Sequence, residues 1–315
     1  MERITGRRNP VVTDIKKLKK RAARETLGLA FVEGRRLVLE AIAASGSGKG
    51  NTTRAGNNSK PFKIRIICVS ESFARGGGFP EIDNAAEGGG FRFIEFPDDV
   101  FGAFSDTKNP QGILAVVETP EYSLDEIITG ARGPLRLIML DNVADPGNAG
   151  GILRTAWAAG FSGTVFSAGC VDAYEPKVIR ASMGGIFHLP FIRGADLTEV
   201  IGILRNNGCK VYASSAVAGG DADAEDAEPS PEVRKRSREP GMRLPESLDC
   251  FGGAYGFGSA AIVIGGEARG VGGEIIALCD GLLSIPMPGG AESLNAGVAA
   301  GILMYEFVRR DIHRF

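Results

Sequence analysis

The chain has 315 residues, a net charge of −2 and an ordinary composition apart from its 45 glycines, about twice the usual share. No apolar run approaches the roughly 18 residues of a membrane span, and the N-terminus lacks the apolar segment of a secretory signal. Five scattered cysteines without a CxxC pair indicate reduced thiols, and two distant histidines, His188 and His313, make a zinc site unexpected. These features predict a cytoplasmic protein of about two domains, without membrane or metal.

The charge is unevenly distributed. Residues 1–36 contain eleven Lys or Arg and four Asp or Glu, a net of +7, so the remainder carries −9. Within this stretch, Lys16, Lys17, Lys19, Lys20 and Arg21 form a basic cluster. Such a cluster contacts phosphates in nucleic-acid-binding proteins, but it is also typical of a solvated helix face. Taken alone, the cluster favours the solvated helix face.

Residues 1–118 predict a small α/β domain. Helical spacing over residues 10–44 indicates two helices, with Thr13 or Asp14 capping the first and a short strand at 31–34 before the second. Stretches 45–61 and 75–90 are rich in glycine and are expected to be loose insertions. Further strands are predicted at 64–69, 91–94 and 113–117, followed by a linker at 119–133 with one helical turn.

Residues 134–315 predict a second domain in which strands and helices alternate. Asn148 is expected to cap a helix at 149–159, with Leu153 and Trp157 on its buried face. The polar, charge-segregated stretch 218–247 is interpreted as a disordered insertion. The alternation predicts an α/β fold with a parallel sheet covered on both faces. The predicted strands are 135–140, 165–166, 211–213, 260–264 and 282–285, and the further helices are 177–183 and 197–206.

A helix is also predicted after the last strand. Leu294, Val298, Ile302 and Tyr305 recur at helical spacing, and the pair Gly297 and Gly301 leaves one helix face bare. A second backbone is therefore expected to approach this face closely. Taken alone, this strand-loop-helix unit is equally typical of an ordinary α/β domain.

Three glycine-bearing loops follow predicted strands, after Leu140, Ile264 and Ile285. In open parallel sheets, ligands bind at the carboxyl ends of the strands. The loops read DNVADPGNAGGILRTA, IVIGGEARGV and IPMPGGAESLN. In this order they resemble the three motifs of the SpoU (TrmH-like) branch of the SPOUT methyltransferases. The N-terminal stretches RNPVVTDIKKLKKRAARETLGLAFVEGRRLVLEA and SDTKNPQGILAVV similarly resemble the substrate-binding domain of the ribosomal-RNA members.

The resemblance covers nearly the whole chain except the three insertions, and it carries several implications. It implies S-adenosylmethionine-dependent 2′-O-methylation of ribose in ribosomal RNA. It also implies a trefoil knot in the C-terminal SPOUT domain and a homodimer with sites near the interface. The N-terminal domain with its basic helix is expected to bind the RNA. Handedness and threading rules alone favour an ordinary open sheet, so the knot is implied by the resemblance only.

The resemblance also assigns roles to particular residues. Arg154 matches the catalytic arginine, and Asn148, Glu267, Ser293 and Asn295 match the polar residues of the three motifs. Positions that cradle the methyl donor are matched by Gly265, Gly266, Ile285 and Leu294. The sequence departs from the family pattern after Asn295, where Ala296-Gly297 replaces Val-Ser or Val-Ala, a small-for-small change that bears on the packing of the donor loop.

The chemistry of methyl transfer fits these residue types. The attacking 2′-hydroxyl needs either removal of its proton or stabilisation of the developing oxyanion. The family proposal makes Arg154 the base. Because a guanidinium hardly loses its proton, a charged Arg154 that fixes a phosphate and stabilises the alkoxide is the alternative. For Glu267, a loop-anchoring role is as well supported as a substrate contact.

Three competing functions are compatible with parts of the pattern. A tRNA 2′-O-methyltransferase shares the motifs but usually lacks the full N-terminal domain. A noncatalytic RNA-binding ribosome-assembly factor would keep the fold, and the intact Arg154, Ser293 and Asn295 speak against it. A nicotinamide-binding enzyme is disfavoured because no G-x-G-x-x-G opens a helix after a strand with an acidic residue about 20 positions on. The sequence does not distinguish housekeeping modification from antibiotic resistance.

Overall fold

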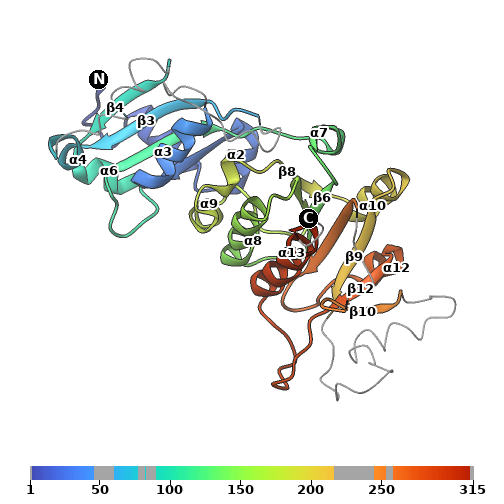
Figure 1. Cartoon of the computed structure of the whole chain (residues 1–315). Helices are drawn as coiled ribbons and strands as arrows, with labels where there is room; N and C mark the ends of the chain where they lie inside the picture. Colours follow the sequence, from blue (N-terminus) through green and yellow to red (C-terminus); the bar gives the residue numbers. More distant parts are fainter. Residues whose placement is uncertain are drawn as a thin grey trace. The chain divides into compact units, whose positions relative to one another are not determined.

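The computed structural model (Figure 1) describes residues 2–45, 60–76, 82, 90–215, 245–252 and 258–312. The chain divides into two compact units. Unit 1 comprises residues 1–121 and 172–188, and unit 2 comprises residues 122–171 and 189–315. Most of the predicted insertions 45–61, 75–90 and 218–247, and also His313, lie outside the described residues.

Unit 1 contains a five-stranded mixed sheet in the order β1-β4-β3-β5-β2. Strands β1, β3 and β4 run parallel, whereas β5 is antiparallel to both of its neighbours, β3 and β2. The strands are β1 (Glu2–Arg3), β2 (Leu29–Glu33), β3 (Ile64–Ser70), β4 (Arg92–Phe96) and β5 (Ile113–Glu118). The helices are α1 (Pro10–Lys17), α2 (Arg21–Leu27), α3 (Arg35–Ala44), α4 (Glu71–Arg75), α6 (Asp98–Phe104) and α9 (Pro176–Ser182), with a 3₁₀ turn at Gly185–Phe187.

The first helix of unit 1 begins earlier than predicted. The side chain of Asn9 accepts a hydrogen bond from Val11 N at 2.9 Å, and Pro10 occupies the first helical position. Proline suits that position because its missing N–H would have no intrahelical partner there. Thr13 and Asp14 therefore lie within α1, and the prediction that either one caps it was wrong.

Unit 2 contains a seven-stranded sheet in the order β10-β12-β9-β11-β6-β7-β8, with every pairing parallel, as predicted. The strands are β6 (Arg136–Asp141), β7 (Gly163–Ser167), β8 (Phe191–Ala195), β9 (Lys210–Ser215), β10 (Ser247–Asp249), β11 (Ala260–Gly265) and β12 (Gly281–Ser284). The helices are α7 (Leu124–Gly130), α8 (Pro146–Ala158), α10 (Leu197–Asn206), α12 (Gly273–Leu278) and α13 (Ala296–Ile312).

Helices cover both faces of the parallel sheet. On one face, Ile201 and Leu204 of α10 and Ile276 of α12 pack in one buried cluster with alternate strand residues such as Met139 and Val263. On the other face, α13 packs against α8 and β11, beside α8 in Figure 1. Burial on both faces explains why these strands read as continuous apolar runs.

The last helix exposes part of its predicted apolar face. Val298 and Tyr305 are 51% and 49% exposed, whereas Ala300, Leu303 and Phe307 are buried. Similarly, Leu153 of α8 is buried as predicted, but Trp157 is 38% exposed. The helix α13 is apolar around most of its circumference, so its sequence does not select which stripe faces the sheet.

Residues 172–188, between β7 and β8 of the parallel sheet, belong to unit 1 and not to the range 134–315 in which the sequence places them. The guanidinium of Arg24 donates to Asp172 Oδ2 at 2.8 and 2.6 Å, and both side chains are 3% exposed. The ring of Phe62 also packs edge-on against Phe187, 5.0 Å between centroids. Long-range contacts of this kind leave no local sequence pattern.

Candidate functional site at the ends of the parallel strands

The site begins at the carboxyl end of β6, where Asp141 and Asn142 follow the buried strand. Asp141 Oδ2 accepts a hydrogen bond from Gly272 N at 2.7 Å, and its Oδ1 accepts one from Asn142 Nδ2 at 2.7 Å. Asn142 has a φ of 56°, a left-handed conformation that asparagine tolerates better than most residues. Asp141 therefore ties the loop after β6 to the loop after β11.

Glycines bring the same two loops into backbone contact. A Cβ on Gly266 would overlap the carbonyl group of Asn142, and one on Gly265 would overlap the backbone of Gly270 and Val271. The amide of Gly266 donates to Asp141 O at 2.8 Å. Glycine is required here because the chains approach more closely than a side chain permits.

Asn148 joins these loops from the first turn of α8. The cap of α8 is Asp145, whose Oδ1 accepts from Asn148 N at 2.8 Å, and Pro146 opens the helix. The prediction that Asn148 caps a helix starting at residue 149 was therefore wrong. Its side chain is buried and its Nδ2 donates to Glu267 Oε1. Asn148 thus acts as a bridge between the first and second motif loops.

The third motif loop meets the same position. Asn295 Oδ1 accepts from Gly297 N at 2.9 Å and from Val298 N at 3.2 Å, so this side chain satisfies the first amides of α13. A Cβ placed on Gly297 would lie 3.3 Å from Asn148 Oδ1, and one on Gly301 would lie 3.9 Å from Thr155 Cγ2. The bare face of α13 therefore lies against α8, as the pattern predicts, and Asn148, Glu267 and Asn295 gather at one place.

Arg154 and Ser293 differ from these three residues. Both are exposed, and in the part of the chain that the structure describes neither side chain has a hydrogen bond or an ion pair. Asn148, Glu267 and Asn295 are engaged in protein contacts, whereas Arg154 and Ser293 remain available to a substrate. The structure thus divides the five predicted catalytic residues into three whose side chains hold the loops and two whose side chains make no polar contact among the described residues, although Glu267 and Asn295 are exposed as well.

Of the four predicted cofactor-binding residues, Gly265 and Gly266 lie at the end of β11, Ile285 directly follows β12, and Leu294 lies just before α13. Strand β9 separates β11 from β12 in the sheet. Gly266 and Ile285 are buried, and Gly265 and Leu294 are half-buried. Gly266 uses its amide and carbonyl within the protein, so Gly265 and Gly266 contribute backbone without side-chain cover, and Ile285 and Leu294 offer apolar surface. Apolar surface beside uncovered backbone fits a nucleoside-containing ligand such as S-adenosylmethionine, which contains an aromatic base.

An open cavity of about 270 Å³ adjoins the loops after β6 and β11. Its lining includes Asp141, Asn142, Arg269 and Glu274, none of which the sequence reasoning selected. The position of Asp141-Asn142 directly after a buried strand, at the expected ligand-binding edge, is the signal that would have identified the first two. Arg269 and Glu274 flank Gly270 and Gly272 in the sequence, and no comparable sequence signal identifies these two residues.

All five cysteines are free and buried, and burial raises the pKa of the Cys170 thiol, the cysteine that donates to Leu140 O at the end of β6. No group of three potential metal-binding side chains occurs among the described residues. No helix in the same residues is long and apolar enough to cross a membrane.

Comparison with known families covers both units. The SpoU rRNA Methylase family matches residues 136–305, more than half of the chain. A second family, described as RNA 2′-O ribose methyltransferase substrate binding, matches residues 31–123. The two matches include all three motif loops and most of the sheet of unit 1.

Similar proteins match over nearly their full length. The 23S rRNA (guanosine(2553)-2′-O)-methyltransferase RlmP of Bacillus subtilis is 30% identical over 97% of this chain and 98% of its own. The AdoMet-bound rRNA methyltransferase of Sinorhizobium meliloti has a TM-score of 0.74 at 25% identity, covering 99% and 98% of the two chains. The SpoU methyltransferase AviRb of Streptomyces viridochromogenes, solved with AdoMet, has a TM-score of 0.73 at 25% identity, covering 97% and 99%.

Proposed function

The chain belongs to the SpoU family of rRNA methylases, and on this premise we propose that it transfers a methyl group from S-adenosylmethionine to a ribose 2′ oxygen in ribosomal RNA. Similar proteins named for this activity match the chain from end to end, including the unit that binds substrate RNA. The single observation that carries the proposal is the meeting of the three motif loops at Asn148, through Glu267 on one side and the start of α13 on the other.

In the proposed reaction, S-adenosylmethionine would supply the methyl group and leave as the neutral thioether S-adenosylhomocysteine, and the proton of the ribose 2′-hydroxyl would pass to solvent water. Arg154, exposed and charged, lies against the ribose and the adjacent phosphate and stabilises negative charge on the attacking oxygen. Ser293 hydrogen-bonds the sugar. Asn148, Glu267 and Asn295 are positioning residues, because their side chains hold the loops that carry the reacting groups.

The proposal includes a trefoil knot, supported by the chain order in unit 2. Strand β12 inserts between β10 and β9, and the helix that follows it then lies against α8 and β11, on the far side of β9. The proposal also places the protein in the cytoplasm, because the bacterial relative is named for a modification of 23S rRNA.

A homodimer is the final part of the proposal. Trp157 of α8 and Val298 and Tyr305 of α13 are exposed large apolar side chains on two helices that pack side by side (Figure 1). A second copy of this chain would bury them, and Arg154 on the same helix α8 would then lie near the interface. Tyr305→Glu is expected to convert the protein to a monomer in light scattering, with loss of methyl transfer. A wild-type monomer would refute this part.

The function is tested by transfer of labelled methyl groups to ribosomal RNA from cells that lack the gene, followed by mapping of 2′-O-methyl sites. Arg154→Ala is expected to lower transfer by more than about 10²-fold, while calorimetric binding of S-adenosylmethionine is retained. Arg205→Ala, on the exposed side of α10, is the matched control and is expected to retain wild-type turnover. Turnover of Arg154→Ala at the wild-type rate contradicts its role. Donor binding without transfer to any RNA favours the assembly-factor alternative, and transfer to tRNA alone favours the tRNA enzyme.

A further inference from the structure

The loop of residues 105–112, between α6 and β5 in unit 1, has no part in the site above. Its ends, Ser105 and Gly112, are buried, whereas Lys108, Asn109 and Gln111 at its centre are exposed. Loops with this contrast display side chains outward from a fixed frame. The loop also lies within the region that matches the RNA-substrate-binding family.

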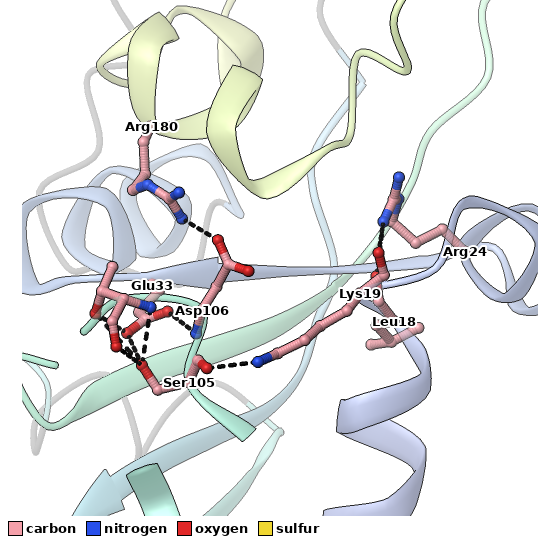
Figure 2. Close-up of polar contacts among 8 residues, drawn as sticks. Leu18, Lys19, Arg24, Glu33, Ser105, Asp106 and Arg180 are labelled. Atoms are coloured by element: carbon pink, nitrogen blue, oxygen red, sulfur yellow. Dashed lines mark hydrogen bonds and ion pairs between the residues drawn. The ribbon is translucent and has the colours of Figure 1, made fainter. Parts of the chain in front are cut away.

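A buried carboxylate holds the first half of this loop. Glu33, only 5% exposed, accepts a hydrogen bond from Asp106 N at 2.8 Å, one from Thr107 Oγ1 at 2.6 Å and one from Ser105 Oγ (Figure 2). Lys19 Nζ, from the segment between α1 and α2, donates to Ser105 O at 2.5 Å. Because a buried carboxylate needs hydrogen-bond donors, these contacts hold the first half of the loop in one conformation in the absence of a partner.

The second half of the loop is fixed to the start of α3. Gln111 Oε1 accepts from Arg35 N at 2.8 Å. Gly112 has a φ of 77°, and a Cβ at this position would lie 2.6 Å from Ser70 Oγ. The exposed centre of the loop is therefore adjacent to the first turn of α3, which carries Arg35 and the exposed Arg36.

The charges around this loop favour an anionic partner. Its acidic residue, Asp106, is paired with Arg180 Nη1 of α9 at 2.9 Å, as Figure 2 shows. Within the described residues, neither Lys108 nor Arg36 has an ion pair. The loop thus presents Lys108 and the amide of Asn109, and the adjacent first turn of α3 adds Arg36 as a second cation without an ion pair among the described residues.

The basic cluster at residues 16–21 is engaged differently. Lys17 pairs with Asp14 at 2.9 Å, Arg21 pairs with Glu25 at 2.7 Å, and Lys19 is directed to Ser105 O. Among the described residues, Lys16 and Lys20 are the cations of this cluster whose side chains have neither an ion pair nor a hydrogen bond. Much of the charge that indicated a phosphate-binding helix in the sequence is therefore neutralised or used in folding.

We infer that residues 105–112, together with the first turn of α3, form the edge of unit 1 that holds the substrate RNA, by contacting unstacked nucleotides in a loop of that RNA. Lys108 and Arg36 bind phosphates, and the Asn109 amide hydrogen-bonds a base edge. An amide side chain on a rigid loop can hydrogen-bond the edge of an unstacked base. Proteins that recognise RNA by sequence use hydrogen bonds of this kind. This inference rests on the proposed function and locates its substrate-binding surface.

The test compares Lys108→Ala/Asn109→Ala with the matched control Lys16→Ala/Lys20→Ala, which also removes exposed side chains from unit 1. For ribosomal RNA from cells that lack the gene, the loop variant is expected to raise KM about tenfold or more, with an unchanged KM for S-adenosylmethionine. In RNA-binding titrations without the donor, Lys108→Ala alone is expected to lower the slope of log K against log salt by about 0.7 to 0.9, as the loss of one phosphate contact requires.

Two outcomes overturn the inference: wild-type RNA affinity in the loop variant, or a larger loss of affinity in the control than in the loop variant. Glu33→Gln provides a second variant that keeps every exposed side chain and removes only the anchoring charge. It is expected to weaken RNA binding while the slope against salt stays near that of the wild type, and an unchanged affinity contradicts the preorganised loop. If the wild-type protein binds RNA through this loop but transfers no methyl group, the proposed function fails and this inference stands.

Discussion

The loop at residues 105–112 in unit 1 and the loop at residues 265–272 in unit 2 are both rigid, but by different means. The first is held by side chains, chiefly the carboxylate of Glu33, which lies more than 70 residues away in the sequence. The second is held by its backbone, because Gly265 and Gly266 allow main chains to touch. One loop therefore depends on a charge and the other on the absence of a Cβ.

This difference indicates what each loop tolerates. A loop fixed by hydrogen bonds to a carboxylate can change Lys108 and Asn109, because these two exposed side chains take no part in the fixing, whereas the exposed Gln111 does take part. A loop fixed by backbone contact leaves almost no position free to change.

The largest effect on stability is expected in unit 1, where distant side chains hold the structure, at the buried ion pair between Arg24 and Asp172. Arg24→Met leaves Asp172 buried without its cation and is expected to cost about 3–5 kcal/mol of unfolding free energy. Urea unfolding measures this, and Arg21→Ala on the same helix, which breaks only an exposed pair, is expected to cost less than about 1 kcal/mol. Equal losses of unfolding free energy in the two variants would show that the buried ion pair stabilises the unit no more than the exposed one.

The next effect tests the backbone-held loop. In Gly266→Ala the new methyl group overlaps the carbonyl of Asn142, so the two motif loops must separate. A displacement of about 1 Å at a reacting group lowers turnover about 10²-fold. Methyl-transfer kinetics provide the measurement. Gly202→Ala in α10, where a Cβ has open space, is the control with unchanged kinetics. Normal turnover of Gly266→Ala would mean that close backbone contact is dispensable.

The smallest effect is expected at Glu33. Glu33→Gln keeps the size of the side chain but removes the charge that accepts from Asp106 N and Thr107 Oγ1, and about 1–3 kcal/mol of stability is expected to be lost. The change in urea midpoint is compared with that of Glu25→Gln, an exposed carboxylate on α2. A loss in Glu25→Gln as large as in Glu33→Gln contradicts the assignment of Glu33 as the anchor of the loop.

The same contrast explains how far the sequence predicts this structure. Glycine-dependent contacts leave a local signature, and the motifs that contain Gly265, Gly266 and Gly297 were recognisable before any coordinates. Contacts between distant side chains leave none: the bonds from Glu33 to residues 105–107 and from Arg24 to Asp172 follow only from the fold. For that reason the parallel sheet and a close approach to the bare face of α13 were predicted, whereas α8 as the partner of that face and the anchored loop were not.

Two predictions about local roles show a further limit. Asn148 is an acceptable cap by residue type, yet Asp145, followed by a proline at the first helical position, fills that position and leaves Asn148 to bridge two loops. Trp157 has the spacing of a buried residue but is 38% exposed. In both cases several residues met the local rule, and only tertiary contacts selected among them.

The return of residues 172–188 to unit 1 has a practical consequence. The backbone crosses between the units three times, at residues 121/122, 171/172 and 188/189. Cutting the chain at a single point in the region 119–133 thus does not yield two complete halves. A fragment ending at residue 121 would carry Arg24 without Asp172, and the complementary fragment would retain α9 and Phe187 without the surface that buries them. Exchange of the RNA-binding unit between relatives by simple fusion is therefore expected to fail unless this excursion is exchanged with it.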